Sequence, residues 1–210
     1  MATQPIRLTR TLGWCRLISV SLALAASAAG AQELRLDPAR SSVSFVGDAF
    51  LHRFRGEAKD ISGRASLEPL AVPPVQKATL RFKMAALTTF NEERDQKMRE
   101  WLQVAAQPEA TFQLESVQLV TGDYQQASAQ NPAKFSVKGT FALHGVAKPI
   151  SGLASGWREN DRVFVSGDVI IDTLTFGLPQ IRQLLMTVGT NVKVRYRFAF
   201  VLPTEYRSER

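Results

Sequence analysis

Cysteine and histidine are scarce in this chain of 210 residues, and their scarcity limits its chemistry. The chain holds one cysteine, Cys15, which excludes a disulfide framework and any zinc site built from several thiolates. The two histidines, His52 and His144, stand in neither an H-x-H nor an H-E-x-x-H spacing. The sequence therefore predicts no metal site and no cofactor.

Sequence motifs of common catalytic sites are also missing. The chain has no G-x-S-x-G nucleophile elbow and no glycine-rich phosphate loop. The run Arg195-Tyr196-Arg197 combines an aromatic residue with cations, as sites for single-stranded nucleic acid do. In a strand, however, the tyrosine and the arginines lie on opposite faces, so they cannot stack on and neutralise the same nucleotides. We expect a protein that is not an enzyme and binds no nucleic acid. A hydrolase or isomerase that uses His52 or His144 with a carboxylate is the alternative.

The first 31 residues resemble a targeting segment. Arg7, Arg10 and Arg16 precede a short apolar run at 17–26, and small residues follow at 29–31. A basic start, an apolar core and an A-x-A site are typical of a secretory signal peptide. The run is shorter than the ~20 apolar residues that a membrane-spanning helix needs. We expect cleavage after Ala31, and a mature domain at 32–210 that is periplasmic or secreted.

The expected mature domain alternates apolar and polar residues over several stretches, as a strand with one buried face does. The clearest stretches are 80–84, 112–115, 134–143 and 192–200. One segment departs from this period: residues 91–102 have helical composition, with Asn91 as N-cap and Met98, Trp101 and Leu102 on one face. A second short helix or turn is expected at 178–185. About eight mostly antiparallel strands indicate a closed barrel or a sandwich, and periodicity does not choose between them.

The inner face predicted from this alternation is rich in large apolar groups, and the chain contains 12 phenylalanines. Such a face forms either a solid core or a tunnel for a long apolar ligand. The candidate ligand-binding residues are Phe45, Leu80, Phe82, Met84, Phe112, Leu114, Phe135, Val137, Phe141, Val165, Val169, Phe176, Val194, Tyr196 and Phe198.

The order of short motifs resembles the YceI family of exported, lipocalin-like, polyisoprenoid-binding proteins. The segment 36–45 (LDPARSSVSF) is similar to the family's opening motif, and Arg94-Asp95 with 108–112 (PEATF) is similar to its helix block. The strongest match is 137–150 (VKGTFALHGVAKPI), followed by 172–177 (DTLTFG) and the last strand from Val188. No single motif is specific, but five in the same order are.

This resemblance implies a single eight-stranded antiparallel, lipocalin-like barrel. It implies a carrier without catalysis that holds a long-chain amphiphile: a polyisoprenoid, an isoprenoid quinone or a fatty amide. The expected partners are that ligand and, transiently, a membrane surface, with the protein a monomer or a homodimer. A filled-core adaptor that acts through the basic outer face of Lys193, Arg195 and Arg197 is a further alternative.

Overall fold

The computed structural model describes residues 32–49, 52–68, 75–183 and 186–204. The expected signal peptide at 1–31 and the last six residues lie outside this range. The strands are β1 (Gln32–Leu36), β2 (Ser42–Ala49), β3 (His52–Ala58), β4 (Ile61–Leu67), β5 (Val75–Lys83), β6 (Leu87–Thr88), β7 (Glu109–Thr121), β8 (Ala133–Leu143), β9 (Val146–Glu159), β10 (Arg162–Asp172), β11 (Arg182–Gln183), β12 (Met186–Thr187) and β13 (Asn191–Val201).

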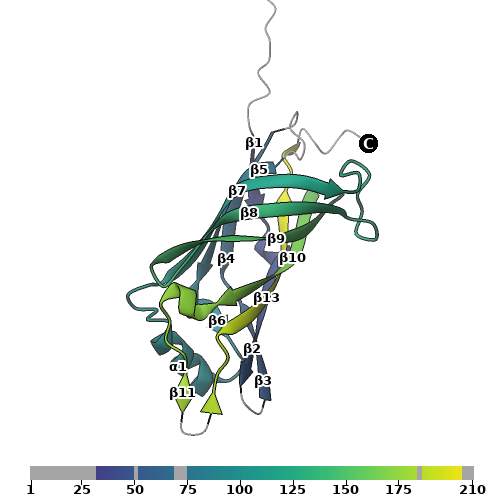
Figure 1. The fold of residues 1–210 in the computed structure, drawn as a ribbon. Helices are drawn as coiled ribbons and strands as arrows, with labels where there is room; N and C mark the ends of the chain where they lie inside the picture. Colours follow the sequence, from purple (N-terminus) through teal and green to yellow (C-terminus); the bar gives the residue numbers. More distant parts are fainter. Residues whose placement is uncertain (1–31, 50–51, 69–74, 184–185, 205–210) are drawn as a thin grey trace, which may run out of the picture.

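The strands close into an eight-stranded antiparallel barrel, as expected (Figure 1). The ring runs β1-β4-β5-β7-β8-β9-β10-β13 and closes where β13 pairs with β1. Strand β13 is long enough to change partner: residues 193–197 pair with β2, and residues 200–201 pair with β1. Closure leaves the two faces of the sheet inside and outside the barrel, which accounts for the period of two in the sequence.

Three neighbouring positions of the ring are occupied by interrupted strands. Strands β1 and β2 are separated by a 3₁₀ helix, η1 (Pro38–Arg40), and both pair with β13. Strands β3 and β4 follow each other closely and pair with β2 and β1 respectively. A second 3₁₀ helix, η2 (Met84–Ala86), separates β5 from β6. Strand β6 pairs with β3, so the interruptions divide the barrel wall into two levels.

Helix α1 (Glu92–Trp101) confirms the helical prediction for 91–102. The Asn91 side chain accepts a hydrogen bond of 2.9 Å from the backbone N–H of Arg94, as an N-cap does. Leu102 is buried at the end of the helix, and the Trp101 indole N–H donates to the Pro179 carbonyl at 2.8 Å. These contacts dock α1 near the segment that connects β10 to β13.

Of the short helix or turn expected at 178–185, the helix is absent from the residues described there. A 3₁₀ helix, η3, spans Thr173–Phe176, and the chain then extends into the small hairpin of β11 and β12. The carbonyl of Ile181 accepts from the N–H of Val188 across this hairpin at 3.0 Å. The Ile181 carbonyl, which would accept within a helix, therefore accepts from the opposite strand. Pro179 also lacks the N–H group that a residue inside a helix donates. Residues 184 and 185 lie outside the described range.

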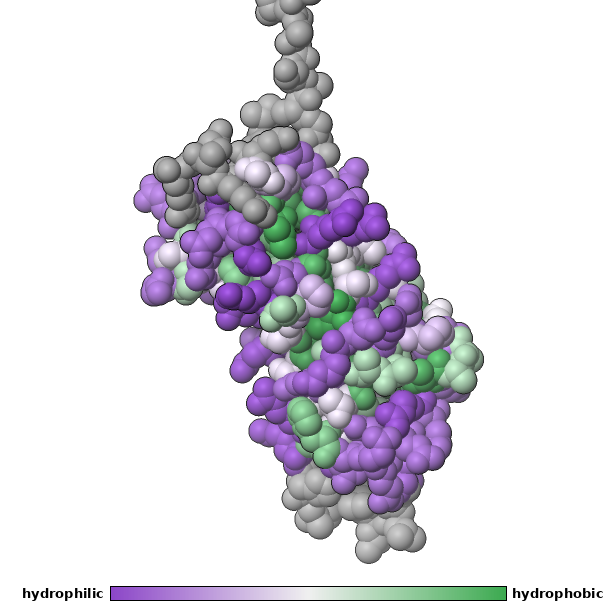
Figure 2. Space-filling model, turned by 180° about the vertical axis from the view of Figure 1, so that it is seen from behind, coloured by the Kyte–Doolittle hydropathy of each residue, from purple (hydrophilic) through white to green (hydrophobic). Residues whose placement is uncertain are grey.

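Polar side chains predominate on the face drawn in Figure 2, where apolar ones form a strip along the middle of the molecule and a smaller patch at one edge. No helix in the described ranges is both long enough and apolar enough to cross a bilayer.

Candidate functional site

The barrel encloses a cavity of 1460 Å³ that follows its axis. Strand β13 shows its extent, because all the inward-facing residues from Val192 to Phe200, and Leu202 beyond the strand, line the cavity. Ten residue steps at about 3.3 Å, on strands tilted by about 40°, correspond to roughly 25 Å along the barrel axis. A solid core, the first alternative left open by periodicity, is therefore wrong.

Fourteen of the predicted ligand-binding residues line this cavity. They are Phe45, Leu80, Phe82, Met84, Phe112, Leu114, Phe135, Val137, Phe141, Val165, Val169, Val194, Tyr196 and Phe198. Their placement inside the barrel follows from alternation, and their contact with a ligand stays a prediction.

Phe176 is the exception and does not line the cavity. It is buried at 2% exposure in η3, and its ring packs edge-on against Phe141 with centroids 5.7 Å apart. Phe176 belongs to a 3₁₀ turn, so the alternation that assigns strand residues to the inner face does not apply to it. It packs against a residue of the cavity wall without lining the cavity itself.

Aromatic rings lie against glycines of neighbouring strands, and this keeps the lumen open. At each pair a Cβ atom on the glycine would lie within 2.7 Å of the ring, closer than any real contact. A ring that covers a glycine lies along the wall instead of reaching across the barrel. The pairs are Phe45 over Gly56, Phe54 over Gly47, Phe112 over Gly139, Phe135 over Gly156 and Tyr196 over Gly167.

Four rings of the cavity wall lie close to one another. The centroid of Phe82 lies 6.5 Å from that of Phe141 and 6.4 Å from that of Phe198. Tyr196 stacks on Phe198 at 5.2 Å, and burial in this apolar wall raises the pKa of its hydroxyl. We call these four rings, Phe82, Phe141, Tyr196 and Phe198, the aromatic belt. The belt is a polarizable, apolar surface with few polar groups, so a hydrocarbon chain can cover it without breaking many hydrogen bonds.

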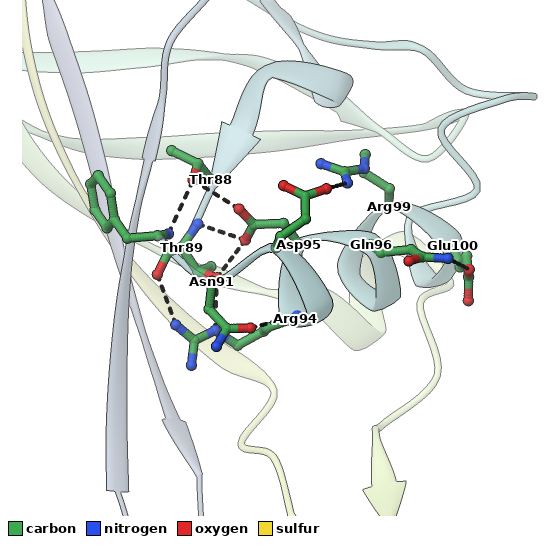
Figure 3. Close-up of polar contacts among 10 residues, drawn as sticks. Thr88, Thr89, Asn91, Arg94, Asp95, Gln96, Arg99 and Glu100 are labelled. Carbon is green, nitrogen blue, oxygen red and sulfur yellow. Dashed lines mark hydrogen bonds and ion pairs between the residues drawn. The ribbon is translucent and has the colours of Figure 1, made fainter.

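The end of the cavity near α1 carries polar groups (Figure 3). Asp95 is 3% exposed, and its carboxylate accepts hydrogen bonds from the Thr88 hydroxyl at 2.8 Å, the Thr89 N–H at 2.7 Å and the Thr89 hydroxyl. Burial alone would raise the pKa of Asp95, but these hydrogen bonds outweigh it and hold the pKa below its usual value. Asp95 therefore stays ionised and fixes Thr89 at the cavity wall.

Arg94 binds the same threonine from the other side. Its Nε donates to the Thr89 hydroxyl oxygen and its Nη2 to the Thr89 carbonyl, both at 2.7 Å. The guanidinium also lies 5.6 Å from the centroid of the Phe54 ring, a cation–π contact. Arg94 and Asp95 thus share Thr89 as a hydrogen-bond partner and do not form a salt bridge with each other.

The two histidines are separated from this site as far as the structure describes them. His144 occupies the β8–β9 turn with a φ of 52°, and its Nδ1 lies 3.3 Å from the Phe176 carbonyl oxygen. It does not line the cavity. His52 begins β3, and its side chain lies outside the described part. Within the described ranges no three His, Cys, Asp or Glu side chains cluster as metal ligands would.

The cations of the outer face engage groups of the barrel itself. Arg195 forms a 2.9 Å salt bridge with Asp168. Arg197 lies over the rings of Trp157 and Phe164, at 5.4 and 4.8 Å from their centroids. The Asp168 carboxylate offsets the charge of Arg195, whereas Arg197 keeps its charge on the exposed outer face that the adaptor alternative requires.

Sequence reasoning missed several lining residues, among them Phe54, Thr89, Arg94, Met98 and Trp101. Phe54 alternates with Arg53 and Arg55, so the period-two rule could have placed it on the inner face. The apolar face of Met98, Trp101 and Leu102 is visible in the sequence, but whether that face meets the cavity depends on how the helix docks.

A family model for the YceI-like domain matches residues 34–200 of the chain. Among solved structures, the chain is similar to Burkholderia cenocepacia BcnA, with a TM-score of 0.63 and 17% identity over 78% of this chain and 98% of that one. A polyisoprenoid-binding domain from Saccharophagus degradans implicated in plant cell wall breakdown gives a TM-score of 0.63 and 18% identity over 81% and 98%. A mutant YCEI protein from Campylobacter jejuni gives 0.52 and 19% over 69% and 85%. No curated protein matches the sequence.

Proposed function

The chain belongs to the YceI-like domain family, and from this premise we propose that it is a non-catalytic carrier of a long-chain amphiphile. The observation that carries the proposal is the 1460 Å³ cavity with its aromatic and aliphatic wall. Removing apolar surface from water is worth about 25 cal/mol per Å², so a buried hydrocarbon chain binds without any catalytic group. The name of the Saccharophagus degradans relative, a polyisoprenoid-binding domain, agrees with this proposal.

The length of the cavity favours a polyisoprenoid or isoprenoid quinone over an ordinary acyl chain. A bilayer core of about 30 Å accommodates two opposed acyl chains, so each chain spans about 15 Å. The cavity is roughly 25 Å long, so an acyl chain that spans about 15 Å would leave part of it empty. A fatty amide with a longer chain also fits this length.

Binding as a function of chain length tests this proposal. A neutral fluorescent probe is loaded into delipidated protein and displaced by linear isoprenoid alcohols of increasing length. We expect the affinity to keep rising with chain length beyond the ~15 Å span of one leaflet. It should level off only when the chain reaches the length of the cavity. Failure of every alcohol to displace the probe, or equal affinity at all lengths, would contradict the carrier function.

We also propose that the carrier is exported to the periplasm or secreted and takes up its ligand during transient contact with a membrane surface. The sequence of residues 1–31 supports export. The intact mass of the protein from its natural host tests this directly. The expected mass begins at Gln32, and a mass that includes residues 1–31 in the soluble protein would contradict export.

A further inference from the structure

The lining of the cavity changes character along its length. Its middle is aromatic and aliphatic, whereas the polar residues that line its α1 end include Arg94, Lys97, Glu100, Gln180 and Arg182, three cations against one carboxylate. The hydrogen bond of Trp101 to the Pro179 carbonyl holds the two contributing segments together. An amphiphile in this cavity would therefore meet hydrogen-bond donors and positive charge at the α1 end.

The charge of Arg94 differs from that of its neighbour Lys97. Lys97 is largely exposed and forms a 2.7 Å salt bridge with Glu93. Arg94 is half-buried, and both of its hydrogen bonds go to uncharged oxygens of Thr89. Among the residues that the structure describes, no carboxylate forms a salt bridge with it.

The guanidinium is held in place before any ligand arrives. Asp95 fixes Thr89, and Thr89 engages the Nε and Nη2 groups of Arg94. Arginine presents five N–H donors, so donors remain for a further acceptor. A half-buried cation on the wall of an apolar cavity is stabilised by an anion that reaches it from the cavity.

We propose that Arg94 is the headgroup anchor of the carrier and selects amphiphiles whose head bears an anionic oxygen, a phosphate or a carboxylate. The tail then extends from α1 past the aromatic belt toward the other end of the barrel, and Arg182 supplies a second positive charge near the head. This inference rests on the proposed carrier function and adds the headgroup class and the orientation of the ligand.

The test compares headgroups on one tail. A twenty-carbon isoprenoid alcohol, the matching monophosphate and the matching carboxylic acid each displace a neutral fluorescent probe from wild-type protein and from three variants. Arg94→Gln removes the charge, and Arg94→Lys keeps the charge but not the planar fork. Arg195→Gln is the matched control, because it removes an arginine from the outer face. The melting temperature of every variant is recorded beside its affinities.

We expect wild-type protein and Arg195→Gln to bind at least one anionic ligand about tenfold or more tightly than the alcohol, as charge-assisted hydrogen bonds predict. Arg94→Gln should lose this preference and bind the alcohol within about twofold of wild type, with Arg94→Lys between them. The relative affinities of phosphate and carboxylate identify which head the site prefers.

Two results would overturn the inference. One is equal binding of all three ligands by wild-type protein, and the other is a preference for anionic heads that survives Arg94→Gln. A purely structural role of Arg94 would lower the melting temperature and weaken all three ligands together, leaving the preference intact. If none of the ligands binds wild-type protein, the carrier function fails as well, and this outcome is distinct from the other two.

Discussion

The ring of Phe135 covers Gly156 of the neighbouring strand so closely that a Cβ atom on this glycine would lie 2.7 Å from the ring's Cε2 atom. The other nearby atoms also belong to the same ring, and no backbone atom opposes the Cβ. The absence of a side chain at Gly156 therefore determines where the Phe135 ring lies. Phe45 over Gly56 and Phe54 over Gly47 are pairs of the same kind, whereas a backbone oxygen also approaches the Cβ position at Gly139 and Gly167. At Gly156, Gly56 and Gly47 the missing side chain determines where the ring lies, and with it the width of the cavity.

Gly156→Ala should displace the Phe135 ring into the lumen and reduce ligand occupancy. Overpacking of this kind costs about 1–3 kcal/mol of stability, or a few degrees of melting temperature in a chain of this size. Gly152→Ala is the matched control: it lies on the same inner face, and the nearest atom to its Cβ is a backbone oxygen at 3.8 Å. Equal ligand occupancy in both variants, measured by native mass spectrometry, would contradict the role assigned to Gly156.

Phe141→Trp should change ligand content more than stability. Phe141 lines the cavity and contacts Phe82, so a larger ring here extends into space that the ligand would use. Ile170→Trp is the control, since Ile170 is 61% exposed on the outside of the barrel. Ligand content is measured after solvent extraction and stability by thermal unfolding. Loss of folding without selective loss of ligand would show that no tunnel passes this position.

Asp95→Ala should destabilise the protein by about 1–3 kcal/mol, because the buried donors of Thr89 and the half-buried hydroxyl of Thr88 lose their acceptor. Urea unfolding measures this loss. Gln96→Ala, at the next and exposed position of α1, should change stability by less than about 0.5 kcal/mol. Similar losses in the two variants would mean that the Asp95 hydrogen bonds do not secure the helix.

The pairing of Asp37 with Arg162 should make stability depend on pH in the acid range. The Arg162 Nε donates to Asp37 Oδ2 at 2.8 Å, and this hydrogen bond lowers the pKa of the carboxyl. A group whose pKa is lowered on folding stabilises the protein fully above its unfolded pKa, about 3.9 for Asp, and loses that contribution as pH falls through the folded value. Asp37→Asn should therefore be less stable than wild type at pH 7, with the gap closing below about pH 4. A gap that stays constant down to pH 3 would contradict this.

The sequence predicts the inner face well because strand geometry requires it. Once residues 134–143 and 192–200 are assigned as strands, the period of two places Phe135 and Tyr196 on one side, and the structure confirms this. Phe176 was misplaced because it belongs to a turn. Periodicity alone could not distinguish a closed barrel from a sandwich. The barrel was predicted from the order of short motifs that resembles the YceI family.

The glycine contacts and the role of Thr89 could not be predicted in this way. That Phe135 meets Gly156 depends on the register of β8 with β9, and a shift of one residue would invert the pairing. The N-cap at Asn91 fixes where α1 begins, but the partners of Arg94 and Asp95 depend on how the helix packs against β6. Such long-range placement has no local sequence pattern.

Native mass spectrometry of protein exported with its own first 31 residues, followed by solvent extraction and lipid identification, is the most direct test of whether the barrel carries a lipid. We expect one long-chain amphiphile per barrel, with a chain longer than one bilayer leaflet. A correctly exported protein that is empty, and that binds no long-chain isoprenoid afterwards, would contradict this expectation.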